Sequence, residues 1–163
     1  MIKIKELSLE ELDARDVRDE YTKYSSDASD WRYQVAEDEE FFLGMQLTVN
    51  QKDYLLSIGQ PPEANNKIRP AVEQVLANVA SSSPEWDVIA TGQTDNDIAN
   101  VYNALLDKIW NDSGGDRHFR NICRDYIVKG VGYMYVYPDW QAEQGAGGIR
   151  IKRIAPECVF VDP

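Results

Sequence analysis

A lysine beside two closely spaced glycines, at Lys129-Gly130-Val131-Gly132, raises the possibility of phosphate binding. A phosphate cradle places its glycines after a strand and before a helix, so that amides at the helix N-terminus face the anion. Here a helical pattern precedes the glycines and a tyrosine-rich strand pattern follows them, which reverses that order. We therefore predict that Gly130 is the left-handed cap of a helix and that Lys129 favours that helix end electrostatically. Gly132 is expected to allow close backbone approach where the strand begins, and no nucleotide site is predicted.

The stretch "NDSGGD" at 111–116 is superficially similar to the segment around the nucleophile of trypsin-like proteases. Those enzymes are all-β and need a histidine and an aspartate well upstream of the serine. The only histidine of this chain, His118, lies just downstream and on a predicted helix. The two glycines therefore predict a turn between helices rather than a catalytic serine.

Metal binding has little support in the sequence. Asp95 and Asp97 could form a metal-binding pair, but both fall in the first turn of a predicted helix, where the dipole favours acidic side chains. No glycine, third carboxylate or histidine follows at the spacing of a calcium loop or a two-metal site. Cys123 and Cys158 are too far apart for a known zinc spacing, so we expect buried free thiols, which fit a cytosolic compartment. The sequence thus indicates no catalytic, cofactor-binding or metal-binding residues, and no enzyme.

The first half of the chain carries mainly helical patterns with recognisable ends. The acidic run at 37–40 is predicted to be a solvated helix face, which would repel phosphate or dock a basic partner. The expected elements are a helix from a capping box at Ser8-Leu9-Glu10-Glu11 to 24, a break at 25–30, a polar helix over 31–40, a short helix over 50–58 capped by Asn50, a helix over 65–80 and a half-buried strand over 85–91.

The second half combines two strong helical patterns with a β region. Helices are expected from Thr94 to about Asn111 and from Asp116 onward, and strands over 132–138, 148–154 and 157–161, with a glycine-rich turn between the first two strands. Tyrosines 133, 135 and 137 share one strand face and should pack against Trp140, a helix or a neighbouring subunit. The predicted fold class is α+β, mainly helical with a small C-terminal antiparallel hairpin or sheet.

The composition of the 163 residues is that of a soluble globular chain, with 43% hydrophobic and 28% charged residues. Runs of apolar residues fall short of the ~20 needed to cross a bilayer, and no membrane association is expected. The net charge is −11 and uneven, since residues 1–60 carry 7 basic against 14 acidic side chains. Proteins that grip nucleic acid need a basic excess on some face, so tight DNA binding is disfavoured.

Three stretches, taken in order, carry a resemblance to a known family. They are "FFLGMQLTVNQKDYLLSIGQPPEANNKIRPAVEQVLANV" (41–79), "DYIVKGVGYMYVYPD" (125–139) and "IRIKRIAPECVFVDP" (149–163). Their order resembles the N-terminal part of a tailed-bacteriophage portal protein of the short-tailed phage type, over residues 8–163. The resemblance implies the wing portion of such a subunit, an incomplete fold from which the stem, clip and crown are absent. It divides into an acidic helical segment (1–60), a helical core with one short strand (61–131) and a β-hairpin region (132–163).

The resemblance also implies a role. Portal proteins form rings, usually dodecamers, at one capsid vertex of the virion, after assembly in the host cytoplasm. They nucleate head assembly and let double-stranded DNA pass without sequence-specific binding during packaging and ejection. The implied partners are the major capsid protein, the scaffolding protein, the terminase large subunit and a tail adaptor protein. Two other readings stay open from the residues: an acidic α+β adaptor that binds another protein without forming rings, and a nucleotide-dependent enzyme.

Overall fold

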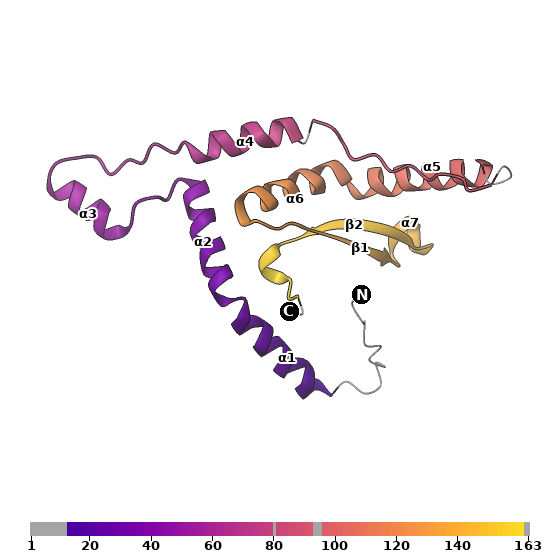
Figure 1. The fold of residues 1–163 in the computed structure, drawn as a ribbon, viewed down its shortest axis with the longest axis horizontal. Coiled ribbons are helices and arrows are strands. Elements are labelled where there is room, and N and C mark those ends of the chain that lie inside the picture. Colours follow the sequence, from indigo (N-terminus) through magenta and orange to yellow (C-terminus); the bar gives the residue numbers. More distant parts are fainter. Residues whose placement is uncertain (1–12, 80, 93–95, 162–163) are drawn as a thin grey trace.

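A computed structural model of the chain describes residues 13–79, 81–92 and 96–161 (Figure 1). Helices dominate, and a two-stranded antiparallel sheet follows them, which confirms the predicted α+β class. The elements in chain order are α1 (Ala14–Asp27), α2 (Ser29–Leu43), α3 (Val49–Ser57), α4 (Ile68–Val79), α5 (Asn96–Ser113), α6 (Gly115–Lys129), β1 (Tyr133–Asp139), α7 (Ala142–Gly145), β2 (Gly148–Ile154) and a 3-10 turn, η1 (Pro156–Cys158).

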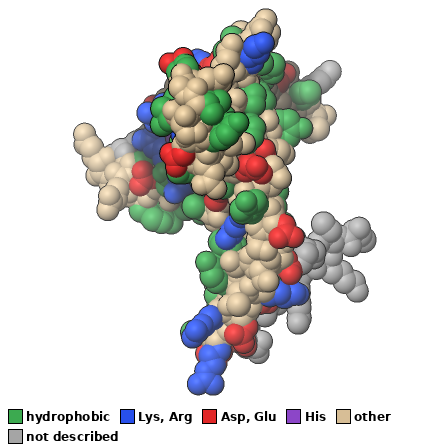
Figure 2. Space-filling view, turned by 90° about the vertical axis from the view of Figure 1, so that its left-hand side faces the viewer, with side chains coloured by type: hydrophobic (Ala, Val, Ile, Leu, Met, Phe, Trp, Pro, Cys, Tyr) green, Lys and Arg blue, Asp and Glu red, His purple; other side chains and the backbone are tan. Residues whose placement is uncertain are grey.

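Helix α6 is the centre of the molecule. It packs against α2, α4, α5 and both strands, whereas α1 and α2 form a long arm that extends away from the body (Figure 1). Helix α5 projects on the opposite side, and β2 runs beneath α5 and α6. Figure 2 shows the arm from another side, with acidic and basic side chains along it and hydrophobic side chains exposed on the body above. The shape is therefore open, with a small core around α6.

The arm is almost continuous. The Asp13 carboxylate accepts a hydrogen bond from the Arg15 amide at 3.5 Å and caps α1. The break predicted over 25–30 is a single residue, Ala28, which ends α1 and precedes α2. Helix α2 ends at Gly44, whose φ of 88° suits glycine, and the Met45 amide donates to the Glu40 carbonyl at 2.8 Å. The predicted capping box at Ser8 to Glu11 lies outside the described residues.

The short helix α3 begins one residue earlier than predicted, and its cap is a different residue. Thr48, not Asn50, is the N-cap: its hydroxyl accepts from the Gln51 amide at 3.3 Å, and the Gln51 side chain accepts from the Thr48 amide at 2.9 Å. This reciprocal pair satisfies two helix amides at once, whereas Asn50 lies inside the helix. The prediction of Asn50 as the cap was therefore wrong by two positions.

The predicted inter-helix turn at 111–116 is confirmed. Gly114 has a φ of 67°, and α6 starts at Gly115, one residue before the predicted Asp116. A Cβ atom on Gly115 would lie 2.1 Å from the Trp110 ring, so only glycine lets the ring cover this turn. The Trp110 ring nitrogen donates to the Asp116 carboxylate at 2.9 Å, and Ser83 donates to the same oxygen at 2.6 Å. These two hydrogen bonds, that of Ser83 first, lower the pKa of Asp116.

Two predicted strands are wrong. Residues 85–91 are irregular: the Asn103 side chain on α5 accepts from the Val88 amide at 2.7 Å and donates to Asp87 at 3.1 Å, so a side chain takes the place of a strand partner. Val88 and Ala90 are half-buried as the alternation predicts, but Trp86 is 55% exposed and the segment has no strand partner. Residues 157–161 begin instead as the 3-10 turn η1, because Pro156 starts a helical turn and cannot donate to a ladder.

The hairpin strands are confirmed, within one residue at the ends of β1. Tyr133 pairs with Ile154 and Asp139 with Gly148, and the glycine-rich turn contains α7. The tyrosines do share a face, with the Tyr135 and Tyr137 rings stacked 5.6 Å apart. Within the chain, the Lys152 ammonium group lies 4.7 Å from the Tyr137 ring centroid and Trp140 is exposed, and packing of this face against a neighbouring subunit stays a prediction. A cation over stacked rings stabilises this face without burial.

Across residues 13–79, 81–92 and 96–161, every helix is too short or too polar to span a bilayer.

Few hydrophobic side chains of the described residues are buried. The accessible surface is 12963 Å², against roughly 8,000 Å² for a folded monomer of this mass. The buried hydrophobic residues are Val35, Phe42, Leu76, Ala99, Trp110 and Ala142. The fold therefore leaves much apolar surface uncovered.

Candidate functional site

The junction between α6 and β1 has the geometry predicted for its glycines. Gly130 has a φ of 79° and donates its amide to the Tyr126 carbonyl at 3.0 Å, which makes it the left-handed cap. A Cβ atom on Gly132 would lie 2.6 Å from the Ile122 carbonyl oxygen, so the strand passes close to the helix backbone. Both glycines lie at a helix C-terminus, where the dipole disfavours an anion.

Lys129 occupies a different environment from the predicted helix-end cation. Its side chain is only 4% exposed, and its ammonium group lies 2.7 Å from a Glu39 oxygen of α2 and donates to Glu157 of η1. Burial alone would lower the pKa of Lys129, but hydrogen bonds to Glu157 and Glu39, reinforced by their charges, raise it above its ordinary value. The lysine therefore stays charged and ties three elements together.

The acidic run at 37–40 is only partly the solvated face that the sequence predicts. Glu37 and Glu40 are exposed, whereas Glu39 is partly covered and pairs with Lys129 and, at 3.7 Å, with Arg124. Glu39 thus faces α6 rather than solvent. The run marks where the arm helix contacts the centre of the molecule.

A second buried ion pair joins α6 to β2. Asp125 is fully buried, and Arg153 donates to it from Nε and, at 2.8 Å, from Nη2. Such a two-pronged contact fixes geometry as well as charge. The same strand is bound along its outer edge, since the Arg153 amide donates to His118 Nδ1 at 3.3 Å and the Ile151 amide to Ser113 Oγ at 3.0 Å. Side chains of α5 and α6 thereby satisfy backbone donors that no third strand pairs.

We call these groups the ionic core. It consists of Glu39, Arg124, Asp125, Lys129, Arg153 and Glu157. Each of its buried charges has a partner of opposite sign, which is the arrangement that makes a buried charge tolerable. The ionic core holds α2, α6, β2 and η1 in register, and it supplies no unpaired acid or base to a reaction.

The remaining candidate residues are not brought together. Asp97 lies in the first turn of α5 and Asp95 lies outside the described residues, so the proposed pair is not tested. Among the described residues, no three histidine, cysteine or acidic side chains cluster as metal ligands. Cys123 is a half-buried free thiol whose pKa burial raises, whereas Cys158 is exposed, which corrects the expectation that both are buried.

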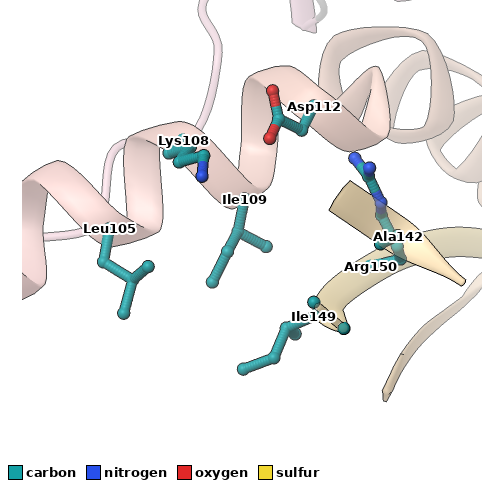
Figure 3. A pocket seen from close by; sticks show the side chains of 9 residues that line it. Leu105, Lys108, Ile109, Asp112, Ala142, Ile149 and Arg150 are labelled. Carbon is teal, nitrogen blue, oxygen red and sulfur yellow. The ribbon is translucent and has the colours of Figure 1, made fainter. Parts of the chain in front are cut away.

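Two hollows on the body have apolar side chains in their walls, and charged side chains also line the second. The first, the α4/α6 groove, has a volume of about 370 Å³ and is lined by Val75, Val79, Ile122, Cys123, Tyr126, Ile127 and Gly132. The second is a hollow of about 230 Å³ between α5 and β2, in which Leu105 and Ile109 point toward the side on which Ile149 lies (Figure 3). The chain is thus organised as a set of contact surfaces on an ionic core.

The ionic core is what sequence reasoning missed. The signal was present in part, since Lys129 and Asp125 lie on the side of α6 that faces the hairpin, among positions that the helical period places inward. Their partners come from segments tens of residues away, at Glu39, Arg153 and Glu157, and no local spacing connects them. Only the tertiary arrangement reveals that these charges are paired.

Comparison with known proteins identifies a family for this chain. The family model described as "Phage P22-like portal protein" matches residues 18–163, almost the whole chain. A comparison with curated proteins finds no match. The match includes the three stretches whose motifs carried the resemblance, 41–79, 125–139 and 149–163. This chain belongs to the phage P22-like portal protein family.

Proposed function

We propose that this protein assembles into a closed ring at one capsid vertex and forms part of the channel for double-stranded DNA during packaging and ejection. The observation that carries the proposal is the family match over residues 18–163. The uncovered apolar surface supports it, because side-to-side contacts between copies would remove such surface from water. The expected ring is a dodecamer, and its assembly in the host cytoplasm nucleates the head.

Residues 1–163 are the wing portion in this proposal, with the three parts expected from the sequence. The wing contacts neighbouring subunits and the major capsid protein, and the complete particle engages the scaffolding protein, the terminase large subunit and a tail adaptor. The protein acts as a structural part and not as an enzyme, a role supported by the family and by the pairing of each charge in the ionic core.

Mass photometry and negative-stain imaging of the purified protein test the proposal directly. We expect closed rings with a central hole and a mass that is an integral multiple of the subunit mass. Monomers at micromolar concentration would contradict ring formation and favour the acidic adaptor. ATP turnover that is lost on Lys129→Met would contradict the structural role and favour a nucleotide-dependent enzyme.

A further inference from the structure

The N-terminal half of α5 carries an apolar stripe that nothing in the described structure covers. The stripe consists of Ile98, Val101, Tyr102 and Leu105, at the 3 and 4 spacing that places side chains on one side of a helix. Each is exposed, and Val101 is 67% exposed although it lies on a helix rather than a loop. At its C-terminal end the stripe continues into the hollow with Leu105, Ile109 and Ile149 (Figure 3). A ridge of this length on a soluble helix marks a contact surface.

The α4/α6 groove has the complementary form. It is lined almost entirely by hydrophobic atoms, and it lies between two packed helices toward the arm, whereas the stripe lies on the α5 projection (Figure 1). The groove lies at the centre of the molecule, and the stripe lies on the α5 projection away from it (Figure 1). A contact between them must therefore join different copies, and because the two surfaces differ it is heterologous.

Charge favours the same pairing. Helix α5 carries three aspartates and one lysine, so its net charge is −2, whereas α6 carries four basic and two acidic side chains, for a net charge of +2. Asp97 and Asp112 are exposed on α5 and Arg117 is exposed on α6, whereas Arg120 already pairs with Glu73 of α4, and Arg124 and Lys129 pair with Glu39. Opposite charges around an apolar contact fix its register and speed its formation.

The exposed area is large enough for a ring. The accessible surface of 12963 Å² exceeds that of a typical folded monomer of this mass by roughly 4,000–5,000 Å². A standard interface buries about 800 Å² on each partner, and each ring subunit has two such faces. An open surface of this size accommodates two such faces.

From these observations we infer that the α5 stripe of one copy inserts into the α4/α6 groove of the next copy. This inference rests on the proposed ring and names its side-to-side contact. The ridge of Val101 and Leu105 lies against the groove walls of Ile122 and Tyr126, in the helix-in-groove manner. Repetition of the contact by rotation closes the assembly.

Cysteine crosslinking tests the contact, because the groove already holds Cys123. In a Cys158→Ser background, Val101→Cys is treated with a short bismaleimide, and denaturing gels display the products. We expect a ladder of covalent multimers that disappears when Cys123 is changed to Ala. Asn100→Cys is the matched control: it is exposed on the other side of α5 and should give at least tenfold less ladder. If Val101→Cys fails to fold, Leu105→Cys replaces it.

Charge insertion provides a second measurement. Val101→Glu places a carboxylate on the stripe, and we expect at least a tenfold rise in the concentration needed for assembly, with unchanged circular dichroism. Asn100→Glu should assemble as the unaltered protein does. Rings without a crosslink to Cys123 would overturn this contact and leave the ring intact. A crosslink found only within single chains would also overturn it, and a protein that stays monomeric would overturn both the contact and the ring.

Discussion

The buried ammonium group of Lys129 decides what the helix–glycine–strand junction does. It faces two carboxylates, Glu39 and Glu157, in place of a phosphate, and the burial that would discharge an isolated lysine is offset by those partners. A lysine used in this way is a structural tie between the arm and the end of the hairpin. Its removal leaves two carboxylates facing each other without a counter-charge.

Lys129→Met is therefore expected to lower the free energy of unfolding by about 2–3 kcal/mol, toward the low end for a broken buried pair because both carboxylates are about one-third exposed. Urea unfolding followed by circular dichroism measures the change. Lys52→Met, at an exposed position of α3, is the matched control and should shift the midpoint by less than about 0.5 kcal/mol. Equal free energies of unfolding for Lys129→Met and Lys52→Met would show that the ion pairs of Lys129 with Glu39 and Glu157 do not stabilise the fold.

His118 makes the junction of α6 and β2 sensitive to pH. Its Nδ1 accepts the Arg153 amide hydrogen, which requires a neutral ring, and burial together with the Arg117 and Arg153 charges lowers its pKa below the ordinary 6.5. Below pH 6.5 the unfolded chain binds a proton that the folded chain excludes. Stability is therefore fully present above pH 6.5 and is lost as the pH falls through the folded pKa.

The single histidine of the chain allows a direct check by NMR, since its ring protons titrate without overlap. We expect a midpoint below 6.5 in the folded protein. Between pH 7 and the onset of carboxylate titration, the free energy of unfolding of the unaltered protein should fall as the pH falls. His118→Asn keeps an acceptor near the same place but has no imidazole to titrate, so its free energy of unfolding should not show this fall. A histidine midpoint at or above 6.5 would contradict the hydrogen bond to Arg153.

At the scale of elements, Asn66 connects two helices through one side chain. Its amide donates to the Phe42 carbonyl at the end of α2 at 2.9 Å, and its oxygen accepts from the Ile68 and Arg69 amides at the start of α4 at 3.1 and 3.2 Å. One residue thus satisfies the C-terminus of one helix and the N-terminus of another. The loop that carries α3 is closed at its base by this contact.

Asn66→Ala removes both functions and should cost about 1–2 kcal/mol, the range for loss of a helix cap. Asn66→Asp keeps the cap oxygen but has no donor for the Phe42 carbonyl, so we expect an intermediate loss. Thermal unfolding of the two variants beside the unaltered protein separates the contribution of the α4 cap from that of the hydrogen bond to Phe42. Equal losses of stability in Asn66→Asp and Asn66→Ala would show that the hydrogen bond to α2 carries the whole effect. No loss of stability in either variant would contradict both contacts.

Local signals predicted the helices better than the strands. Apolar periodicity located α4, α5 and α6 within two or three residues, and the glycine pattern correctly predicted the turn at Gly114 and the helix cap at Gly130. Helix periodicity and glycine turns both depend on residues that are neighbours in the sequence. The strand expected over 85–91 failed because alternation alone does not supply a partner strand, and Asn103 satisfies that backbone instead. The ionic core lay beyond prediction for the same reason, since its partners meet only in three dimensions.

The whole molecule is a set of surfaces arranged around one helix. Burial of six hydrophobic side chains among the described residues is small for a chain of this length, and exposed apolar side chains occur on the arm, around α3, along the α4/α6 groove, on α5 and on the hairpin. Stability therefore depends on what covers these surfaces. In the proposed ring, contacts between copies would cover these surfaces and add to the stability of each subunit.

The net charge determines how this chain is expected to interact with DNA. The chain carries 17 basic and 28 acidic side chains, and its first 60 residues have twice as many acidic as basic groups. Non-specific DNA binding depends on releasing counterions through basic side chains and typically has a Kd of about 1–100 µM at physiological salt. Repulsion instead should keep duplex DNA free to slide past this part of the protein.

We therefore expect no binding of a fluorescent 30-bp duplex, in anisotropy titrations at about 0.15 M salt, up to roughly 100 µM protein. Binding should stay absent when the salt is lowered to about 0.05 M, because fewer ions screen the repulsion as well. A variant with Glu37, Asp38 and Glu40 changed to Lys keeps the paired Glu39, gains six units of positive charge per chain and should bind measurably with a steep salt dependence. Salt-sensitive binding by the unaltered protein would contradict a non-adhesive surface and would place a basic DNA-gripping face on this chain.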